Sequence, residues 1–227
     1  MPKPLSVLCV GDLHFPFARR ASVSQAVTLA RKLKPKVIVQ MGDLYDLYSF
    51  SRFARSQNLL TPKQEIERGR KHAEEFWLMI RAAAGKGVEC FQILGNHDQR
   101  AVKMALATLP ELEPFMDHSR HMWQFEGVTT SKSERDELIL DGVCYMHGYR
   151  KFGEHVRHNL MNTACGHLHR GGVHYMRHGS KTLWELNAGF LADPASIPMS
   201  YSAQARFSQH TQGVGFIDDY GPRFIAF

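Results

Sequence analysis

The sequence of 227 residues contains no long hydrophobic run. A helix that crosses a bilayer needs roughly 20 consecutive apolar residues, and no stretch approaches that length. The apolar run at residues 5–10 is short, and Asp12 and His14 follow at once, where a secretory signal would have a small-residue cleavage site. The sequence therefore predicts a cytoplasmic protein without a membrane partner, in which residues 5–10 form a buried strand.

Cysteines are few and widely spaced. The four cysteines, Cys9, Cys90, Cys144 and Cys165, form no Cys-x-x-Cys pair, and each lies in an apolar, strand-like stretch. This placement favours free, buried thiols in a reducing compartment over a disulfide framework or a thiolate metal site.

Acidic residues are outnumbered, with 22 Asp and Glu against 28 Lys and Arg, so the net charge is +6. A positive surface favours an anionic partner such as nucleic acid. A mildly basic enzyme without a polymer partner explains the charge equally well, so charge alone does not decide between the two.

Strand and helix patterns alternate in the first half of the chain. Apolar runs at residues 5–10, 36–41 and 88–94 predict buried strands, and helical periodicity covers residues 22–33 and 61–84. Thr61 is placed to cap the second helix, with Pro62 at its first position. This order predicts a parallel sheet with right-handed crossovers.

The second half contains shorter strand-like runs with short connections, at residues 137–140, 142–146, 163–165, 173–176 and 182–186. They predict a more antiparallel second sheet packed on the first, with a helix near residues 152–160 and a surface loop at residues 193–212. The predicted fold class is α/β: a two-sheet β-sandwich of mixed strands flanked by helices. No linker divides the chain, so residues 1–227 are predicted to form a single domain.

Polar clusters follow the predicted strands. The first three strands end in Gly11-Asp12-Leu13-His14, Gly42-Asp43-Leu44-Tyr45-Asp46 and Gly95-Asn96-His97-Asp98, and later runs end in His147-Gly148 and Gly166-His167-Leu168-His169. Because ligands bind beyond the carboxyl ends of strands in open α/β sheets, we expect these clusters to meet in one site.

The clusters contain seven candidate metal ligands: Asp12, His14, Asp43, Asn96, His147, His167 and His169. Mixed imidazole and oxygen donors suit transition metals. Seven ligands are too many for one tetrahedral ion but suit two ions that share a carboxylate. Two such ions, about 3.5–4 Å apart, clamp a phosphoryl group and make a bound water nucleophilic. We expect two divalent ions, manganese first, with iron, zinc, nickel, cobalt or magnesium as alternatives.

In this order the motifs Asp-x-His, Gly-Asp, Gly-Asn-His-Asp, His-Gly and Gly-His-x-His resemble the calcineurin-like metallophosphoesterase superfamily. The resemblance spans residues 5–189 and includes the Asn187-Ala188-Gly189 turn. It implies that Asp12, His14 and His169 hold one ion, that Asn96, His147 and His167 hold the other, and that Asp43 bridges them. It further implies that His97 is the general acid for the leaving oxygen and that Asp46 orients it.

Phosphoprotein phosphatases of that superfamily follow the second Asp with Arg-Gly, whereas Asp46 is followed by Leu47-Tyr48. The motifs therefore resemble the phosphodiesterase and repair-nuclease branches more closely. Three hypotheses remain: a phosphodiesterase acting on nucleic acid or a nucleotide, a phosphomonoesterase, and a scaffold without catalysis. Such scaffolds usually lack a ligand or the acid histidine, and none is missing here.

Other residues have two interpretations each. The aromatic and arginine residues of the stretch 45–55 either bind nucleic acid or, slightly favoured, pack beneath a loop with solvated arginines. Arg150 and Lys151 either hold a phosphate oxygen or form a solvated basic turn. Asp98 is predicted to cap a helix that begins at Gln99. The remaining histidines, His155 and His210 among them, are predicted to lie at the surface. The lesser alternative for His155 and His158 is a contact with a metal ligand rather than with the metal.

Overall fold

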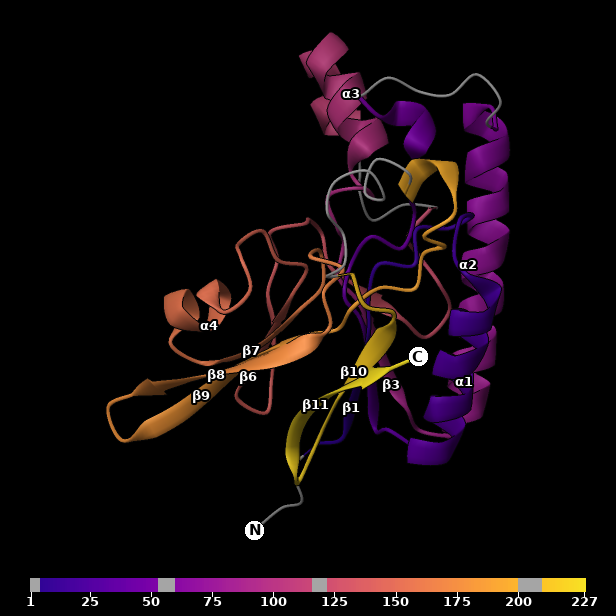
Figure 1. Cartoon of the computed structure of the whole chain (residues 1–227). Helices are drawn as coiled ribbons and strands as arrows, with labels where there is room; N and C mark the ends of the chain where they lie inside the picture. The colour runs from indigo at the N-terminus through magenta and orange to yellow at the C-terminus, as the bar shows by residue number, and fades with distance from the viewer. Residues whose placement is uncertain (1–4, 53–59, 116–121, 200–209) are drawn as a thin grey trace.

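The computed structural model describes residues 5–52, 60–115, 122–199 and 210–227, and shows two mixed sheets packed face to face (Figure 1). The first sheet has the strand order β11-β10-β1-β2-β3-β4. Strands β1 to β4 are parallel, and β10 and β11 extend the sheet in antiparallel fashion. Its strands are β1 (Val7–Val10), β2 (Val37–Gln40), β3 (Glu89–Gln92), β4 (Thr129–Thr130), β10 (Gly213–Asp218) and β11 (Gly221–Ala226).

The second sheet has the order β5-β6-β7-β9-β8. Its central pairs, β6 with β7 and β7 with β9, are parallel, while β5 and β8 are antiparallel to their neighbours. The sheet is therefore less antiparallel than the short connections suggested. Its strands are β5 (Leu138–Leu140), β6 (Val143–Met146), β7 (Asn162–Cys165), β8 (Gly172–His178) and β9 (Lys181–Asn187).

Helices cover the outer faces of both sheets (Figure 1). Two long helices lie against the first sheet, and α4 lies against the second. Thr61 caps α2, as the sequence predicts, and the structure adds a reciprocal capping box with Gln64. The helices are α1 (Arg20–Leu33), α2 (Pro62–Ala84), α3 (Arg100–Thr108) and α4 (Glu154–Asn159), and the 3-10 helices are η1 (Tyr48–Phe50), η2 (Pro110–Phe115) and η3 (Ile197–Met199).

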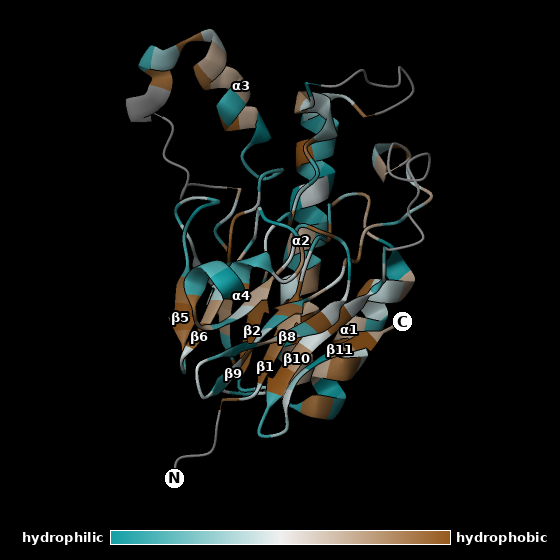
Figure 2. Cartoon of the chain, turned by 60° about the vertical axis from the view of Figure 1, so that its left-hand side comes forward, coloured by the Kyte–Doolittle hydropathy of each residue, from teal (hydrophilic) through white to brown (hydrophobic). Residues whose placement is uncertain are grey.

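Successive side chains of a strand point to opposite faces of the sheet, and this alternation produces two separate apolar clusters. In β1, Leu8 and Val10 pack beneath the long helices, whereas Val7 and Cys9 pack between the sheets. The central strands β1, β2 and β10 are correspondingly largely brown in Figure 2, and α4 is largely teal. All four cysteines are free and buried, as predicted. No helix of the described ranges is long and apolar enough to cross a bilayer.

Two features differ from the sequence prediction, and a third, the stretch 45–55, agrees with the favoured interpretation as far as it is described. Strands β4, β10 and β11 were not predicted; β4 has only two residues, and three glycines interrupt the apolar pattern of β10 and β11. Of the predicted loop at residues 193–212, residues 200–209 lie outside the described ranges, and the preceding part forms η3 with a buried Met199. In the stretch 45–55, Tyr45 is buried and Phe50 packs against the core, while Phe53 and Arg55 lie outside the described ranges.

Candidate metal centre

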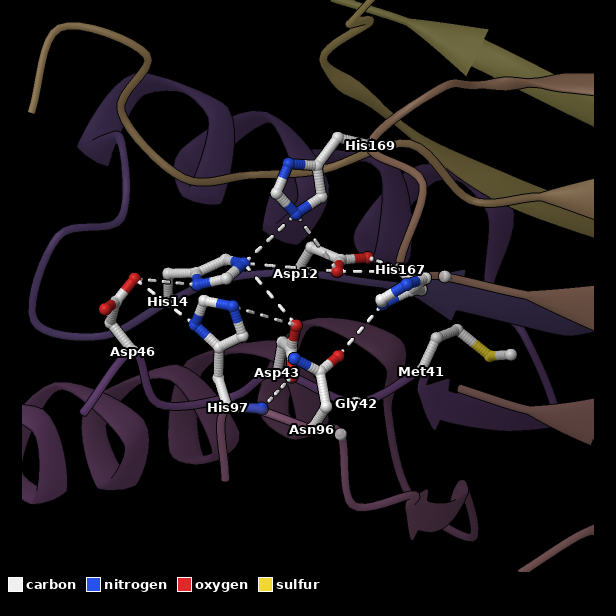
Figure 3. A network of polar contacts seen from close by, with 12 residues as sticks. Asp12, His14, Met41, Gly42, Asp43, Asp46, Asn96, His97, His167 and His169 are labelled. Carbon is white, nitrogen blue, oxygen red and sulfur yellow. Dashed lines mark hydrogen bonds and ion pairs between the residues drawn. The ribbon is translucent and has the colours of Figure 1, made fainter. Parts of the chain in front are cut away.

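The seven candidate ligands come together at the carboxyl ends of strands from both sheets, and all of them except His147 are labelled in Figure 3. The loops after β1, β2 and β3 supply Asp12 and His14, Asp43, and Asn96. The loops after β6 and β7 supply His147, His167 and His169. Because strands of one direction end at the same edge, residues far apart in the sequence become neighbours.

The backbone at this edge turns through conformations that side chains rarely adopt. Five of the seven candidate ligands have φ between 51° and 68°, in the left-handed region. Such conformations cluster at functional sites, where the surrounding structure maintains them. They belong to Asp12, His14, Asp43, His167 and His169.

One group of donors consists of Asp12, His14, Asp43 and His169, whose ligand atoms all lie within 4.8 Å of one another. His14 Nε2 lies 3.2 Å from His169 Nε2 and 3.8 Å from Asp43 Oδ2. His169 Nε2 lies 3.3 Å from Asp12 Oδ1. Nitrogen and carboxylate donors therefore converge on a single point.

A second group consists of Asp43, His147 and His167, with Asn96 beside them. Asn96 Oδ1 lies 3.0 Å from His147 Nε2 and 2.9 Å from His167 Nδ1. His147 Nε2 also lies 3.4 Å from Asp43 Oδ2. Asp43 thus belongs to both groups.

Hydrogen bonds on the far side of two rings direct their free nitrogens into the site. His14 Nδ1 donates to Asp46 Oδ2 at 2.9 Å, and His147 Nδ1 donates to the Met41 carbonyl at 2.9 Å. Histidines that bind metals typically donate their second nitrogen in this way, which sets the tautomer and the ring orientation. The donor set therefore fits divalent cations.

The electrostatics of the site also favour bound positive charge. Burial, and then the neighbouring Asp43, raises the pKa of Asp12 to about 6, although three histidines lower it. Burial lowers the pKa of His167 and of His169 to about 4, so these rings stay neutral at pH 7. The pKa of His147 is raised to about 10, because Asp43 and Asp12 outweigh its burial. The carboxylates of Asp43 and Asp12 therefore favour positive charge at this point.

His97 and Asp46 adjoin the first group. The Nε2 atom of His97 lies 4.0 Å from Asp43 Oδ2, and the Nδ1 atom of His97 lies 3.6 Å from Asp46 Oδ2. Asp46 contacts His14 more closely, at 2.9 Å, so one carboxylate adjoins two imidazoles. Burial raises the pKa of Asp46, but hydrogen bonds with His14 and His97 outweigh it and hold that pKa well below its usual range.

Arg100, at the first position of α3, also reaches the site, and sequence reasoning missed it. Its Nη1 donates to Asp46 Oδ1 and to the Asp46 carbonyl, both at 3.0 Å. Its Nη2 lies 2.9 Å from His97 Nε2. The available signal was its spacing, since a residue three positions after His97 lies one helical turn away.

Asp98 does not cap a helix, contrary to the prediction. The helix begins at Arg100 with Gln99 as its N-cap residue. The buried Asp98 carboxylate instead accepts the backbone N–H groups of Tyr45 and Gly95 at 2.8 Å and of Leu44 at 3.3 Å. It therefore ties the loop of Asp43 to the loop of Asn96, a long-range role that local sequence cannot reveal.

Two histidines predicted to lie at the surface do not. His155 is 1% exposed, and its Nε2 accepts the backbone N–H groups of Tyr149 and Arg150, each at 3.0 Å. It thus supports the turn after His147. His210 is half-buried, and its ring centroid lies 5.1 Å from that of His169.

The basic turn at Arg150 and Lys151 is held in part by stacking of Arg150 on Tyr149. The guanidinium carbon of Arg150 lies 5.0 Å from the ring centroid of Tyr149, and Lys151 is exposed. Arg150 is therefore not simply solvated.

The chain belongs to the calcineurin-like phosphoesterase family, whose profile matches residues 5–171. It is 24% identical over 203 residues to the Gene 54 protein of Mycobacterium phage D29, covering 82% of this chain and 78% of that protein. The Gene 54 protein of Mycobacterium phage L5 is 24% identical over 207 residues, with the same coverage of 82% and 78%.

Solved structures with a similar arrangement include the phosphoesterase YfcE of E. coli, with a TM-score of 0.44 and 15% identity over 95% of this chain and 89% of that one. Vacuolar protein sorting 29 of Cryptosporidium parvum has a TM-score of 0.46 and 13% identity over 99% and 97%. The nuclease MPE of Pseudomonas putida has a TM-score of 0.34 and 13% identity over 96% and 87%.

Membership in this family and the buried cluster of His and Asp side chains make the chain a metal-binding phosphoester hydrolase.

Proposed function

We propose that this chain hydrolyses phosphodiester bonds with two divalent ions, manganese in the first place, and that nucleic acid or a nucleotide supplies the bond. The observation that carries the proposal is the convergence of seven ligand-type side chains on two adjacent points, with Asp43 common to both.

The two groups of donors define two ion positions. When bound, an ion pair supplies positive charge to the phosphoryl oxygens and lowers the pKa of water. Asp12, His14 and His169 would hold the first ion, Asn96, His147 and His167 would hold the second, and Asp43 would serve both.

His97 is the proposed general acid for the leaving oxygen. Burial by itself lowers the pKa of His97, but the carboxylates of Asp43 and Asp46 outweigh burial and raise it. A raised pKa keeps the ring protonated closer to neutral pH, as an acid requires. Asp46 adjoins His97 and His14 together, so we assign it the role of positioning both rings.

One observation favours the second candidate, a phosphomonoesterase. No arginine follows Asp46 in the sequence, but the guanidinium of Arg100 adjoins the site, where it pairs with the Asp46 carboxylate. A guanidinium at this place suits the extra negative charge of a monoester. The net charge of +6 supports the diester of a polyanion instead.

Turnover of bis-(p-nitrophenyl) phosphate and of p-nitrophenyl phosphate with added Mn²⁺ separates the candidates. We expect the diester to be preferred, and preference for the monoester would move the assignment to the second candidate. His97→Ala should keep bound metal yet lose about 10²–10⁴-fold in kcat, the usual size of general-acid help.

Two further variants control this test. The matched control His178→Ala, at an exposed position of β8, should leave turnover unchanged. Asp43→Ala should lose both metal and turnover. Equal turnover in the wild type, His97→Ala and Asp43→Ala would mean that the activity arises elsewhere, as a scaffold without catalysis requires.

We also propose that residues 1–227 act as one cytoplasmic domain. Both sheets contribute donors to the one site, and four free, buried thiols suit a reducing compartment.

A further inference from the structure

A groove opens beside the candidate metal centre, between α3 and the segment that contains η1. Its volume is about 560 Å³, within the roughly 300–1,000 Å³ typical of small-molecule sites. Asn96, one of the seven candidate ligands, lies on its wall together with Arg100. The groove is therefore continuous with the site, and a ligand bound at the ions can extend into it.

The groove combines positive charge with apolar surface. Arg52, Arg100 and Lys103 line it, along with Phe50 and Met104. The Arg100 side chain is 18% exposed and Lys103 is 54% exposed, so both can be reached from the solvent. Asp46 pairs with Arg100 and Glu134 pairs with Lys103, but neither carboxylate belongs to the lining of the groove.

The position of His97 indicates which part of the substrate the groove would hold. Arg100 Nη2 lies 2.9 Å from His97 Nε2, so the groove begins on the side of the proposed general acid. A general acid delivers its proton to the leaving oxygen. The part of the substrate attached to that oxygen therefore lies in the groove.

We infer that the groove binds the leaving portion of the substrate and that this portion is a nucleotide of a nucleic-acid strand. The phosphate of the nucleotide would pair with Arg100 and Lys103, and its base would lie against Phe50 and Met104. Cationic grooves with apolar platforms bind single strands in this manner. The inference rests on the proposed phosphodiesterase function and adds the substrate class and the residues that select it.

The first test compares two diesters in the Mn²⁺-loaded enzyme: hexathymidylate, whose leaving portion is a nucleotide, and bis-(p-nitrophenyl) phosphate, whose leaving portion is small. Met104→Glu places a carboxylate in the groove at a position that is 42% exposed. We expect the ratio of kcat/KM for hexathymidylate to that for the small diester to fall about tenfold through charge repulsion. The matched control Leu78→Glu, on α2 at 74% exposure, should leave the ratio unchanged.

The second test measures binding without turnover. The probe is fluorescein-labelled hexathymidylate with phosphorothioate linkages, titrated by anisotropy at several salt concentrations. Lys103→Ala should weaken binding and reduce the slope of log K against log salt by about 0.7, the value for one lost contact with a single strand. Lys71→Ala, at an exposed position of α2, is the control and should keep the wild-type slope.

The outcomes separate the two proposals. An unchanged selectivity ratio in Met104→Glu, together with an unchanged salt slope in Lys103→Ala, would overturn the groove assignment even if the wild type cleaves both diesters. If the wild type cleaves neither diester, the proposed function fails, and the salt slope then decides the groove alone. If Met104→Glu does not fold, the slope of Lys103→Ala decides in the same way.

Discussion

Replacement of Asp46 by asparagine tests whether this carboxylate orients His14 for metal binding. Asp46 Oδ2 accepts the Nδ1–H of His14 at 2.9 Å, and Asp46 Oδ1 accepts from Arg100 at 3.0 Å. Asparagine offers one oxygen to these two donors, so one of them must face an NH₂ group. His14 then loses the bond that directs its Nε2 toward Asp12 and Asp43, or Arg100 loses its anchor.

The expected effect is selective for one ion. Loss of such an orienting partner typically weakens metal affinity about 10–100-fold. This corresponds to about 1.4–2.8 kcal/mol. The second position should keep its affinity, because His147 is oriented by the Met41 carbonyl instead. Calorimetric titration of the metal-free protein with Mn²⁺ should show one weakened step and one unchanged step.

The control is Glu65→Gln, which alters another buried carboxylate of the same region. Glu65 accepts the backbone N–H groups of Tyr48 and Ser49 and contributes no candidate ligand. Glu65→Gln should leave both steps unchanged. If Asp46→Asn leaves both affinities unchanged, or weakens both equally, the assignment of Asp46 to the His14 position is wrong.

Three further predictions follow from the same contacts. Asp98→Ala removes the acceptor of three buried N–H groups. Because each unsatisfied N–H group costs about 1 kcal/mol or more, the substitution should lower the free energy of unfolding, measured by urea titration, by about 3–5 kcal/mol. Gly95→Ala should destabilise the protein and weaken Mn²⁺ binding, because a Cβ there would collide with the carboxylate of Asp43. Bound Mn²⁺, measured after dialysis, should decline as the pH falls through about 6, where Asp12 takes up a proton, because protons and cations compete for that carboxylate.

The Asp98→Ala and Gly95→Ala predictions each have a matched control variant, and the pH prediction has an outcome that would contradict it. Asp219→Ala removes an exposed carboxylate and should change stability little, and Gly172→Ala places its Cβ at ordinary contact distance, 3.4 Å from Phe152. Equal losses in Asp98→Ala and Asp219→Ala, or in Gly95→Ala and Gly172→Ala, would contradict the packing argument. Constant metal content from pH 7 to pH 4 would contradict the role given to Asp12.

Local sequence was sufficient where neighbours in the chain decide the structure. Strands β1 to β3 stand out because buried parallel strands are continuous apolar runs. The start of α2 stands out because Thr61, Pro62 and Gln64 satisfy the first turn among themselves. The polar clusters stand out because each directly follows a strand.

Contacts between distant segments could not be predicted in this way. Asp98 accepts N–H groups more than 50 residues away, and the buried His155 is held by Glu185 of β9. Arg100 reaches Asp46 only because β2 and β3 lie side by side and end at the same edge. In each case the partner is set by sheet pairing rather than by spacing along the chain.

The sequence by itself determined which donors exist and that each lies at the end of a strand, since strand periodicity and ligand chemistry are local properties. The family resemblance already implied how these donors divide around Asp43. Only the tertiary structure decided that Asp46 adjoins His14 as well as His97 and that Arg100 stands beside the acid. The reason is that distances of 3–4 Å between side chains depend on the register and packing of two sheets, which no single segment encodes.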